Sequence, residues 1–312
     1  MMLSTNNKPK IIAVVGPTAS GKSDLAVDMA LFIKKNAAKL GVSGAEIISA
    51  DSRQVYKGMD IGSNKITVKE MRGIPHHLIS IANPKTTFSA ARYQRLAARI
   101  IKKILKNNKI PIICGGTGFY IDSVIYGIKF PEIKPNTALR KKLEKMETEK
   151  LFLFLQKKDP TRALSIDRHN RRRLIRALEI NFLTGMPVPI LKKEPQFETL
   201  WLGLTADNHI LKNKLSNRLD KRLKKGLLKE VKNLHKKYGL SWKRLESFGL
   251  EYKFTAQFLE KKISEKEMKN KIVDESANYA KRQMTWFKRN SEINWIKDKQ
   301  KALGLTESFL LN

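Results

Sequence analysis

Cysteine is nearly absent from this sequence, and its absence narrows the kind of protein that the chain can be. The single cysteine, Cys114, lies in the apolar run KIPIICGG, so no intrachain disulfide can form and the thiol is expected to pack as a small apolar group. No cysteine framework for structural zinc exists either. Long apolar runs are also missing. The segment MMLSTNNKPK leads into the first predicted strand without an apolar signal segment, and no run of eighteen apolar residues follows. We therefore expect a cytoplasmic protein that does not associate with membranes.

Acidic residues are scarce relative to basic ones. The 312 residues include 62 Lys and Arg but only 29 Asp and Glu, which leaves a formal charge of +33. Such an excess favours an acidic partner, and nucleic acid is the leading candidate because Lys and Arg bind its phosphates. A lysine bias throughout the organism is the alternative explanation, since net charge concerns association rather than fold. The length and the 41% hydrophobic content predict a globular chain of about two domains.

What the chain does contain, near its start, is a glycine-rich phosphate-binding signature. Residues 16–23 read GPTASGKS and match G-x-x-x-x-G-K-[ST] at every fixed position. The match follows the apolar run 11–15 and precedes a segment with helical apolar spacing, which is the context that the motif requires. Backbone N–H groups would face an anion, Lys22 would add a positive charge, and the Ser23 hydroxyl could reach a Mg²⁺ ion. An ordinary strand-to-helix turn is the alternative. The predicted phosphate-binding residues are Gly16, Pro17, Thr18, Ala19, Ser20, Gly21, Lys22 and Ser23.

Short apolar runs alternate with helical patterns in the first half of the chain. Strands are expected at 11–15, 46–49, 77–81 and 110–114, with a later strand at 200–206 that returns to the same sheet. Strands separated by helices indicate an α/β fold with a parallel, P-loop NTPase-like sheet. Residues 8–129 would form the first part of this core, and a basic helical insertion domain would occupy 130–197. Residues 198–312 would add the return strand and a C-terminal region that is helical from Asp207 onward.

A carboxylate follows the second predicted strand. Asp51 comes directly after the apolar residues 47–50, and ligands of doubly wound sheets bind outside the carboxyl ends of the strands, so Asp51 should lie near the phosphate loop. Three roles are open for it: Mg²⁺ ligand, general base, or helix cap and turn former. Polar neighbours that could hydrogen bond to the edge of a base come next, namely Ser52, Arg53, Gln54 and Tyr56.

Two further segments carry candidate site residues. After the fourth predicted strand, the glycines at 115, 116 and 118 would let the backbone approach a ligand closely, and Thr117 offers a hydroxyl there. A tight strand-to-helix turn is the alternative, and it would explain the glycines but not the other features. Farther along, arginines are concentrated among apolar residues at helical spacing, and their guanidinium groups suit phosphates and base edges. A solvated helix face is the alternative for these side chains. They are Arg168, Arg171, Arg172, Arg173 and Arg176.

Several motifs of the chain, taken in order, match those of a known family. They are GPTASGKS, ISADSRQVYKGMDIG, PHHLI, GGTGFYI, RRRLIRALEI, SFGLEYK and AKRQMTWFKRN. On these motifs the chain resembles the bacterial tRNA dimethylallyltransferases from Ile11 to the neighbourhood of Asn290. The resemblance implies that the loop holds the diphosphate of dimethylallyl diphosphate, with Mg²⁺ as cofactor. It also implies a monomeric enzyme that transfers the dimethylallyl group to N6 of the adenosine immediately 3′ of the anticodon in tRNA and releases diphosphate.

The resemblance further implies roles for individual residues. Asp51 would be the catalytic base that takes the proton from N6, and Thr117 would orient groups near the departing diphosphate. Lys253 stands where many relatives have arginine, an exchange that removes bidentate contact to phosphate. Before the arginine helix the chain has His169-Asn170-Arg171 in place of Asp-Pro, which leaves the start of that helix open. The residues expected to contact tRNA are Asp51, Ser52, Arg53, Gln54, Thr117, Arg140, Arg172, Arg173, Leu174, Ile175, Arg176 and Lys253.

Two other functions remain open on the sequence. A P-loop kinase of a nucleoside or small metabolite would share the loop and the sheet, but it would not need a basic insertion or a basic C-terminal region. A non-catalytic RNA-binding protein would keep the loop only as part of its fold. That function would leave Asp51 and Thr117 without a purpose beside the loop.

Overall fold

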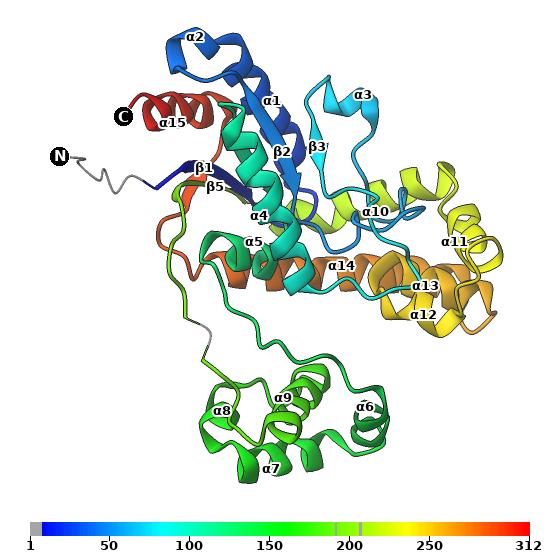
Figure 1. Ribbon diagram of the computed structural model, residues 1–312. Helices are drawn as coiled ribbons and strands as arrows, with labels where there is room; N and C mark the ends of the chain where they lie inside the picture. Colours follow the sequence, from blue (N-terminus) through cyan, green and yellow to red (C-terminus); the bar gives the residue numbers. More distant parts are fainter. Residues whose placement is uncertain (1–7, 191, 206–207) are drawn as a thin grey trace. The chain divides into compact units, whose positions relative to one another are not determined.

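A parallel sheet lies at the centre of the computed structural model, which describes residues 8–190, 192–205 and 208–312 (Figure 1). The strands follow the order β3-β2-β4-β1-β5-β6, and every neighbouring pair is parallel. This arrangement confirms the predicted α/β fold. The strands are β1 (Lys10–Val15), β2 (Ala45–Ser49), β3 (His76–His77), β4 (Ile110–Gly115), β5 (Glu198–Leu204) and β6 (Asn294–Ile296).

Helices cover both faces of this sheet. The side chains of residues 11–15 in β1 are fully buried, as expected for a parallel strand between two helical layers. On one face, Ile12 and Val14 pack in a core with α1 (Lys22–Lys35) and α15 (Lys299–Leu311). On the other face, Ala13 and Val15 share a core with α4 (Ala90–Lys106), α5 (Gly118–Ile125) and helices of the C-terminal region.

The C-terminal region is mainly helical, as predicted. Within the ranges that the structure describes, none of the helices combines the length and the apolar character that a membrane span requires.

The remaining helices of the first unit lie in both halves of the chain. Two short helices follow α1 and β2, namely α2 (Ala37–Leu40) and α3 (Val68–Met71). The C-terminal helices before α15 are α10 (Asn208–Lys224), α11 (Leu227–Lys236), α12 (Trp242–Ser247), α13 (Leu250–Leu259) and α14 (Glu265–Phe287).

The chain divides into two compact units. One contains the residues up to 127 together with 194–312, and the other contains 128–193. The second unit begins and ends earlier than the predicted insertion 130–197, because the Gln196 N–H donates to the Ile125 carbonyl and fixes that segment to the first unit. Four helices pack around an apolar core of their own in the second unit: α6 (Thr137–Leu143), α7 (Thr148–Lys158), α8 (Pro160–Ser165) and α9 (Arg171–Thr184).

Three strand predictions need correction. The expected strand at 77–81 is only β3, because Leu78 and Ser80 adopt left-handed backbone conformations with φ of 61° and 53°. The return strand spans Glu198–Leu204, whereas the prediction was 200–206, and residue 206 lies outside the described residues, as does residue 207, where the helical region was expected to begin. The third correction concerns β6, which lies in the region that was expected to be wholly helical. It pairs with the edge of β5 over three residues, a length too short to show a period in the sequence.

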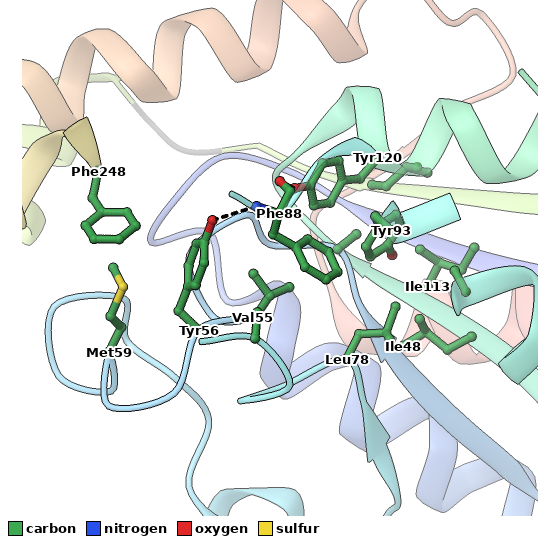
Figure 2. Close-up of a cluster of buried hydrophobic side chains, with 14 of the residues drawn as sticks. Ile48, Val55, Tyr56, Met59, Leu78, Phe88, Tyr93, Ile113, Tyr120 and Phe248 are labelled. Atoms are coloured by element: carbon green, nitrogen blue, oxygen red, sulfur yellow. Dashed lines mark hydrogen bonds between the residues drawn. The ribbon is translucent and has the colours of Figure 1, made fainter. Parts of the chain in front are cut away.

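An apolar cluster fixes the loop that follows β2 at the carboxyl edge of the sheet (Figure 2). The Phe88 N–H donates to the Tyr56 hydroxyl over 3.0 Å, and the Phe248 ring packs edge-on against Tyr56 with centroids 5.2 Å apart. Val55 and Met59 of the same loop are fully buried. The residues just before this anchor, 51–54, are therefore held in place beside the ends of β1, β2 and β4.

Candidate active site

A cavity of about 670 Å³ opens at the carboxyl ends of the central strands, within the first compact unit. The loop after β1, the segment after β2 and helices α10, α13 and α14 all contribute to its walls. Sequence segments that lie far apart therefore meet in one place, as the strand order of a doubly wound sheet requires. The side chains that carry the chemistry below include Lys22, Asp51, Arg53, Arg218, Tyr279 and Gln283.

The glycine-rich loop has the backbone geometry that an anion site requires. Gly21 adopts a left-handed conformation with φ of 83° and precedes α1, and no side chain caps this helix terminus. The first N–H groups of α1 therefore remain available to a ligand. Gly16 has φ of 154°, and a Cβ atom there would lie 2.7 Å from the Leu204 carbonyl oxygen. A side chain at position 16 would push the loop away from β5.

Positive charge and unpaired donors gather beside this loop. The Lys22 Nζ donates to the Pro17 carbonyl over 3.0 Å, and burial lowers the pKa of Lys22. The Arg218 Nη1 donates to the Thr18 hydroxyl over 3.0 Å, and burial lowers the pKa of Arg218 to about 10. The Arg218 Nε and the Ser20 Oγ are buried without a hydrogen-bond partner among the described residues. A bound anion would satisfy these groups and relieve the repulsion between the two cations.

Asp51 forms a turn and keeps one oxygen available. Its Oδ1 accepts hydrogen bonds from the backbone N–H groups of Arg53 (2.7 Å) and Gln54 (3.2 Å). Its Oδ2 has no hydrogen-bond partner among the described residues, and Asp51 lines the cavity. The turn-forming role is therefore real, yet it leaves a carboxylate oxygen free to accept a proton or to bind a cation.

Thr117 lies behind the cavity wall rather than in it. Its hydroxyl accepts a hydrogen bond from the Ser52 N–H over 3.2 Å, and its own N–H donates to the Ala50 carbonyl. Thr117 also contacts Tyr279, whose pKa is raised by burial and further by the nearby Asp51. The contacts of Thr117 thus position the segment that begins at Asp51. Tyr279 itself lies on α14 and lines the cavity.

Gln283 joins two loops of the site. Its Oε1 accepts from the Thr18 N–H over 2.9 Å, and its Nε2 donates to the Gly116 carbonyl over 2.8 Å. A Cβ atom at Gly116 would lie 2.1 Å from that Nε2, so this position must be glycine for the contact to form. Arg218, Tyr279 and Gln283 were not among the predicted site residues. Gln283 lies in the motif AKRQMTWFKRN, but nothing in the local pattern indicates that it reaches residues 16–23.

Glu230 holds the loop that lines the opposite wall. Its carboxylate accepts hydrogen bonds from three successive backbone N–H groups, those of Asp60, Ile61 and Gly62, over 2.6–3.0 Å. The Tyr252 hydroxyl donates to the same carboxylate over 2.9 Å. Glu230 is buried, so these bonds are screened little by water. The carboxylate therefore ties α11 and α13 to the loop after β2.

Replacing Glu230 with alanine should destabilise the protein by at least about 3 kcal/mol, because four donors lose a charged acceptor. Urea unfolding measures this change. The matched control is Glu265→Ala, which removes a surface ion pair with Lys269 and should cost less than about 1 kcal/mol. Equal unfolding midpoints for the two variants would contradict the anchoring role of Glu230.

The residues predicted to contact tRNA fall into different places. Ser52, Arg53 and Gln54 line the cavity, and the Arg53 Nε donates to the Phe248 carbonyl over 2.7 Å. Lys253 lies on α13 outside the cavity lining, with its Nζ 5.0 Å from the centroid of the Phe254 ring. The structure thus places three of these residues in the cavity wall and Lys253 outside it, and contact with tRNA stays a prediction for all four.

In the second unit, α9 begins at Arg171, which settles the helix start that the sequence left open. The Asn170 side chain caps the helix by accepting from the Arg173 N–H over 3.3 Å. Arg168 precedes the helix and pairs with Glu149, so the expectation that it belongs to α9 was wrong. Arg172 and Arg173 are exposed and have no ion-pair partner among the described residues.

For two residues that were predicted to contact tRNA, burial contradicts the prediction. Leu174 is fully buried and Ile175 is nearly so, and both belong to the apolar core of the second unit. Their side chains pack inside because helical spacing turns them away from Arg172 and Arg173. Arg140 and Arg176 have a structural contact as well, since both pair with the fully buried carboxylate of Glu179 over 2.7 Å and 2.5 Å.

Known proteins resemble this chain in sequence over nearly its whole length. The tRNA dimethylallyltransferase of Pelotomaculum thermopropionicum is 40% identical over 303 residues, covering 95% of this chain and 93% of the relative. That of Staphylococcus carnosus is 38% identical over 312 residues, covering 96% and 95%.

Two solved structures resemble the fold over most of the chain. A tRNA isopentenylpyrophosphate transferase from Bacillus halodurans matches with a TM-score of 0.69 at 34% identity, covering 97% of this chain and 96% of that one. A eukaryotic dimethylallyltransferase acting on tRNA matches with a TM-score of 0.80 at 26% identity, covering 97% and 80%. The sequence model of one family, IPP transferase, matches residues 54–290. With that match and relatives that cover nearly its whole length, the chain belongs to the IPP transferase family.

Proposed function

We propose that this protein transfers a dimethylallyl group from dimethylallyl diphosphate to N6 of the adenosine immediately 3′ of the anticodon in tRNA, and releases diphosphate. The observation that carries the proposal is one cavity that contains a phosphate loop with unpaired donors and a carboxylate with a free oxygen. The relatives and solved structures described above are named as transferases of a dimethylallyl or isopentenyl group that act on tRNA, which supports the proposal. We further propose that the enzyme works as a monomer in the cytoplasm, where its tRNA substrate is.

The diphosphate of the donor would occupy the glycine-rich loop. N–H groups at the start of α1, the Lys22 amine and the Arg218 guanidinium all face this position. Negative charge on the diphosphate grows as the allylic carbon–oxygen bond breaks. Donors that are fixed before the reaction stabilise this charge without reorganisation, so they lower the barrier more than they strengthen binding of the substrate.

The same position suits a Mg²⁺ ion. Among the described residues there is no group of three or more His, Cys, Asp or Glu side chains arranged to hold a metal. A Mg²⁺ ion held with a phosphate-containing substrate would need only one or two oxygens from the protein. The Ser23 hydroxyl would supply one, and the free oxygen of Asp51 is left to accept a proton. Bound there, the ion would neutralise part of the diphosphate charge.

Asp51 would accept the proton in the transfer step. The N6 lone pair forms a bond to the allylic C1 carbon, and the electron pair of the C1–oxygen bond leaves with the diphosphate. The N6 proton passes to the Asp51 Oδ2, which the turn contacts of Oδ1 leave free. Thr117 and Tyr279 would keep this segment and the cavity wall in register.

The two alternatives from the sequence find less support. A kinase of a small metabolite does not account for relatives that are tRNA dimethylallyltransferases over 95% of the chain. A purely RNA-binding protein does not account for buried, unpaired donors around the phosphate loop. Incubation of anticodon stem-loop RNA with the protein, Mg²⁺ and dimethylallyl diphosphate, followed by mass spectrometry, tests the reaction. A mass gain of one dimethylallyl group is expected, and ATP consumption with unchanged RNA would refute the proposal.

Arg172 and Arg173 are proposed to bind tRNA phosphates. Replacing both with alanine should raise the tRNA dissociation constant and reduce its salt dependence by up to about two units of log–log slope, near 0.7–0.9 for each lost contact. Arg176 is left intact because its removal would leave the buried Glu179 with one cation fewer. Replacing Lys157 and Lys158, two exposed cations at the end of α7, provides the control. The same slope in both variants would mean that the two arginines only solvate their helix.

A further inference from the structure

Helix α4 carries a concentration of positive charge that the site described above does not use. Over its 17 residues it contains six exposed basic side chains and no acidic residue. None of the six lines the cavity at the carboxyl edge. They are Arg92, Arg95, Arg99, Lys102, Lys103 and Lys106.

These six side chains form a single stripe. Their spacing of three or four residues, with one adjacent pair, places them within a narrow arc of the helix. The opposite side of α4 is buried against the sheet through Tyr93, Ala97, Ile101 and Ile104. With a rise of 1.5 Å per residue the stripe is about 21 Å long.

No carboxylate neutralises the stripe within the part of the chain that the structure describes. Residues 92, 95, 99, 102, 103 and 106 form no ion pair there. The neighbouring elements offer none, since Asp122 of α5 is buried and Glu46 of β2 pairs with His77 and Lys109. Elsewhere the chain does pair its charges, as Lys269 does with Glu265 on α14. Six like charges on one face repel one another, so they favour an external polyanion.

The stripe begins near the active-site end of the sheet and runs away from it. At the start of α4, the Arg92 guanidinium lies 5.1 Å from the centroid of the Phe88 ring, and the Phe88 N–H binds Tyr56 of the loop after β2. At the other end, Lys106 precedes the turn into β4, at the opposite edge of the sheet. Figure 1 shows α4 lying along the sheet between these two edges.

We propose that the α4 stripe is a docking surface for the phosphate backbone of a tRNA stem outside the anticodon stem-loop. The proposal rests on the function proposed above. Double-helical RNA is bound mainly through its shape and backbone, because side chains cannot read its deep, narrow major groove. A row of exposed Arg and Lys along one helix face matches this kind of contact. Docking there would add affinity for whole tRNA without touching the reacting base.

A pair of charge-matched variants tests the docking surface. The first combines Arg95→Gln, Arg99→Gln, Lys102→Gln and Lys106→Gln. The control combines Lys34→Gln, Lys35→Gln, Lys297→Gln and Lys301→Gln, four exposed lysines on α1, on α15 and just before α15. Each variant loses four charges from the formal +33, and glutamine preserves helix propensity. Thermal unfolding verifies that both variants fold.

The readouts are the dissociation constant for a transcribed full-length tRNA and for the anticodon stem-loop RNA, measured across salt concentration. The stripe variant should bind full-length tRNA at least about tenfold more weakly at physiological salt, with a log–log slope lower by up to about three units. It should bind and modify the stem-loop as the wild type does, and the control should match the wild type on both RNAs.

Equal weakening of the two variants would overturn the proposal, because total charge alone would explain it. An equal loss on the stem-loop would overturn it too, since the stripe would then serve the reacting arm. If the wild type failed to modify the stem-loop, the proposed function would fall, and the binding comparison on full-length tRNA would still decide whether the stripe docks RNA.

Discussion

Lys22→Ala should lower kcat/KM for dimethylallyl transfer by at least about a hundredfold, the scale of losing one strong electrostatic stabiliser of the transition state. Within the described ranges the Lys22 amine hydrogen bonds to the Pro17 carbonyl and forms no ion pair, so its removal should leave the fold intact. The charge matters most when the diphosphate leaves, which is why kcat should fall as well as donor affinity. Steady-state transfer to stem-loop RNA at several donor concentrations separates the two effects.

The control for this prediction is Lys39→Ala, a lysine that pairs with Glu307 on the surface. It removes the same charge from the chain and should leave transfer unchanged. If Lys22→Ala transferred the prenyl group as fast as the control and bound the donor equally well, the glycine-rich loop would have no part in the mechanism.

Asp51→Asn should slow the chemical step by about a hundredfold to ten thousandfold, the usual worth of a positioned base. The asparagine Oδ1 can still accept from the N–H groups of Arg53 and Gln54, so the turn should persist while the proton acceptor is lost. Binding of tRNA and of the donor should survive. Single-turnover transfer, measured across Mg²⁺ concentration, isolates the step.

The other roles of Asp51 give different results in the same experiment. A Mg²⁺ ligand would show weakened metal dependence, with activity partly recovered at high Mg²⁺. A residue that only forms the turn would show a lower unfolding temperature and near-normal turnover of the folded fraction. Single-turnover rates close to wild type in Asp51→Asn would rule out the general base.

The parts of the site that depend on local sequence could be predicted. The loop at 16–23 and the carboxylate at Asp51 each follow a buried strand, and strand order alone brings their positions to one edge. Arg218 and Gln283 could not be found this way, because their hydrogen bonds to Thr18 span 200 and 265 residues of sequence. Only the packing of α10 and α14 against the loop reveals them.

The errors have equally physical causes. Leu174 and Ile175 were grouped with the arginines beside them because a motif treats consecutive letters as one surface. A helix instead turns consecutive side chains by about 100°, which sends these two into the core of the second unit. The strand β6 escaped prediction because three residues at a sheet edge owe their conformation to pairing with β5 rather than to their own sequence.

The pairing of β1 with β5 bears on how the chain folds as it leaves the ribosome. β1 forms its ladder from Lys10 opposite Glu198, and the whole of the second unit, residues 128–193, lies between the two strands in sequence. At 5–20 residues per second, roughly ten seconds or more pass between the synthesis of one partner and the other. The second unit has its core within one short stretch of chain, so it can fold during that interval. The edge of β1 that pairs with β5 stays unpaired until residues 198–204 are synthesised. A nascent chain stalled before residue 198 would therefore expose an apolar strand edge, which favours chaperone binding or aggregation.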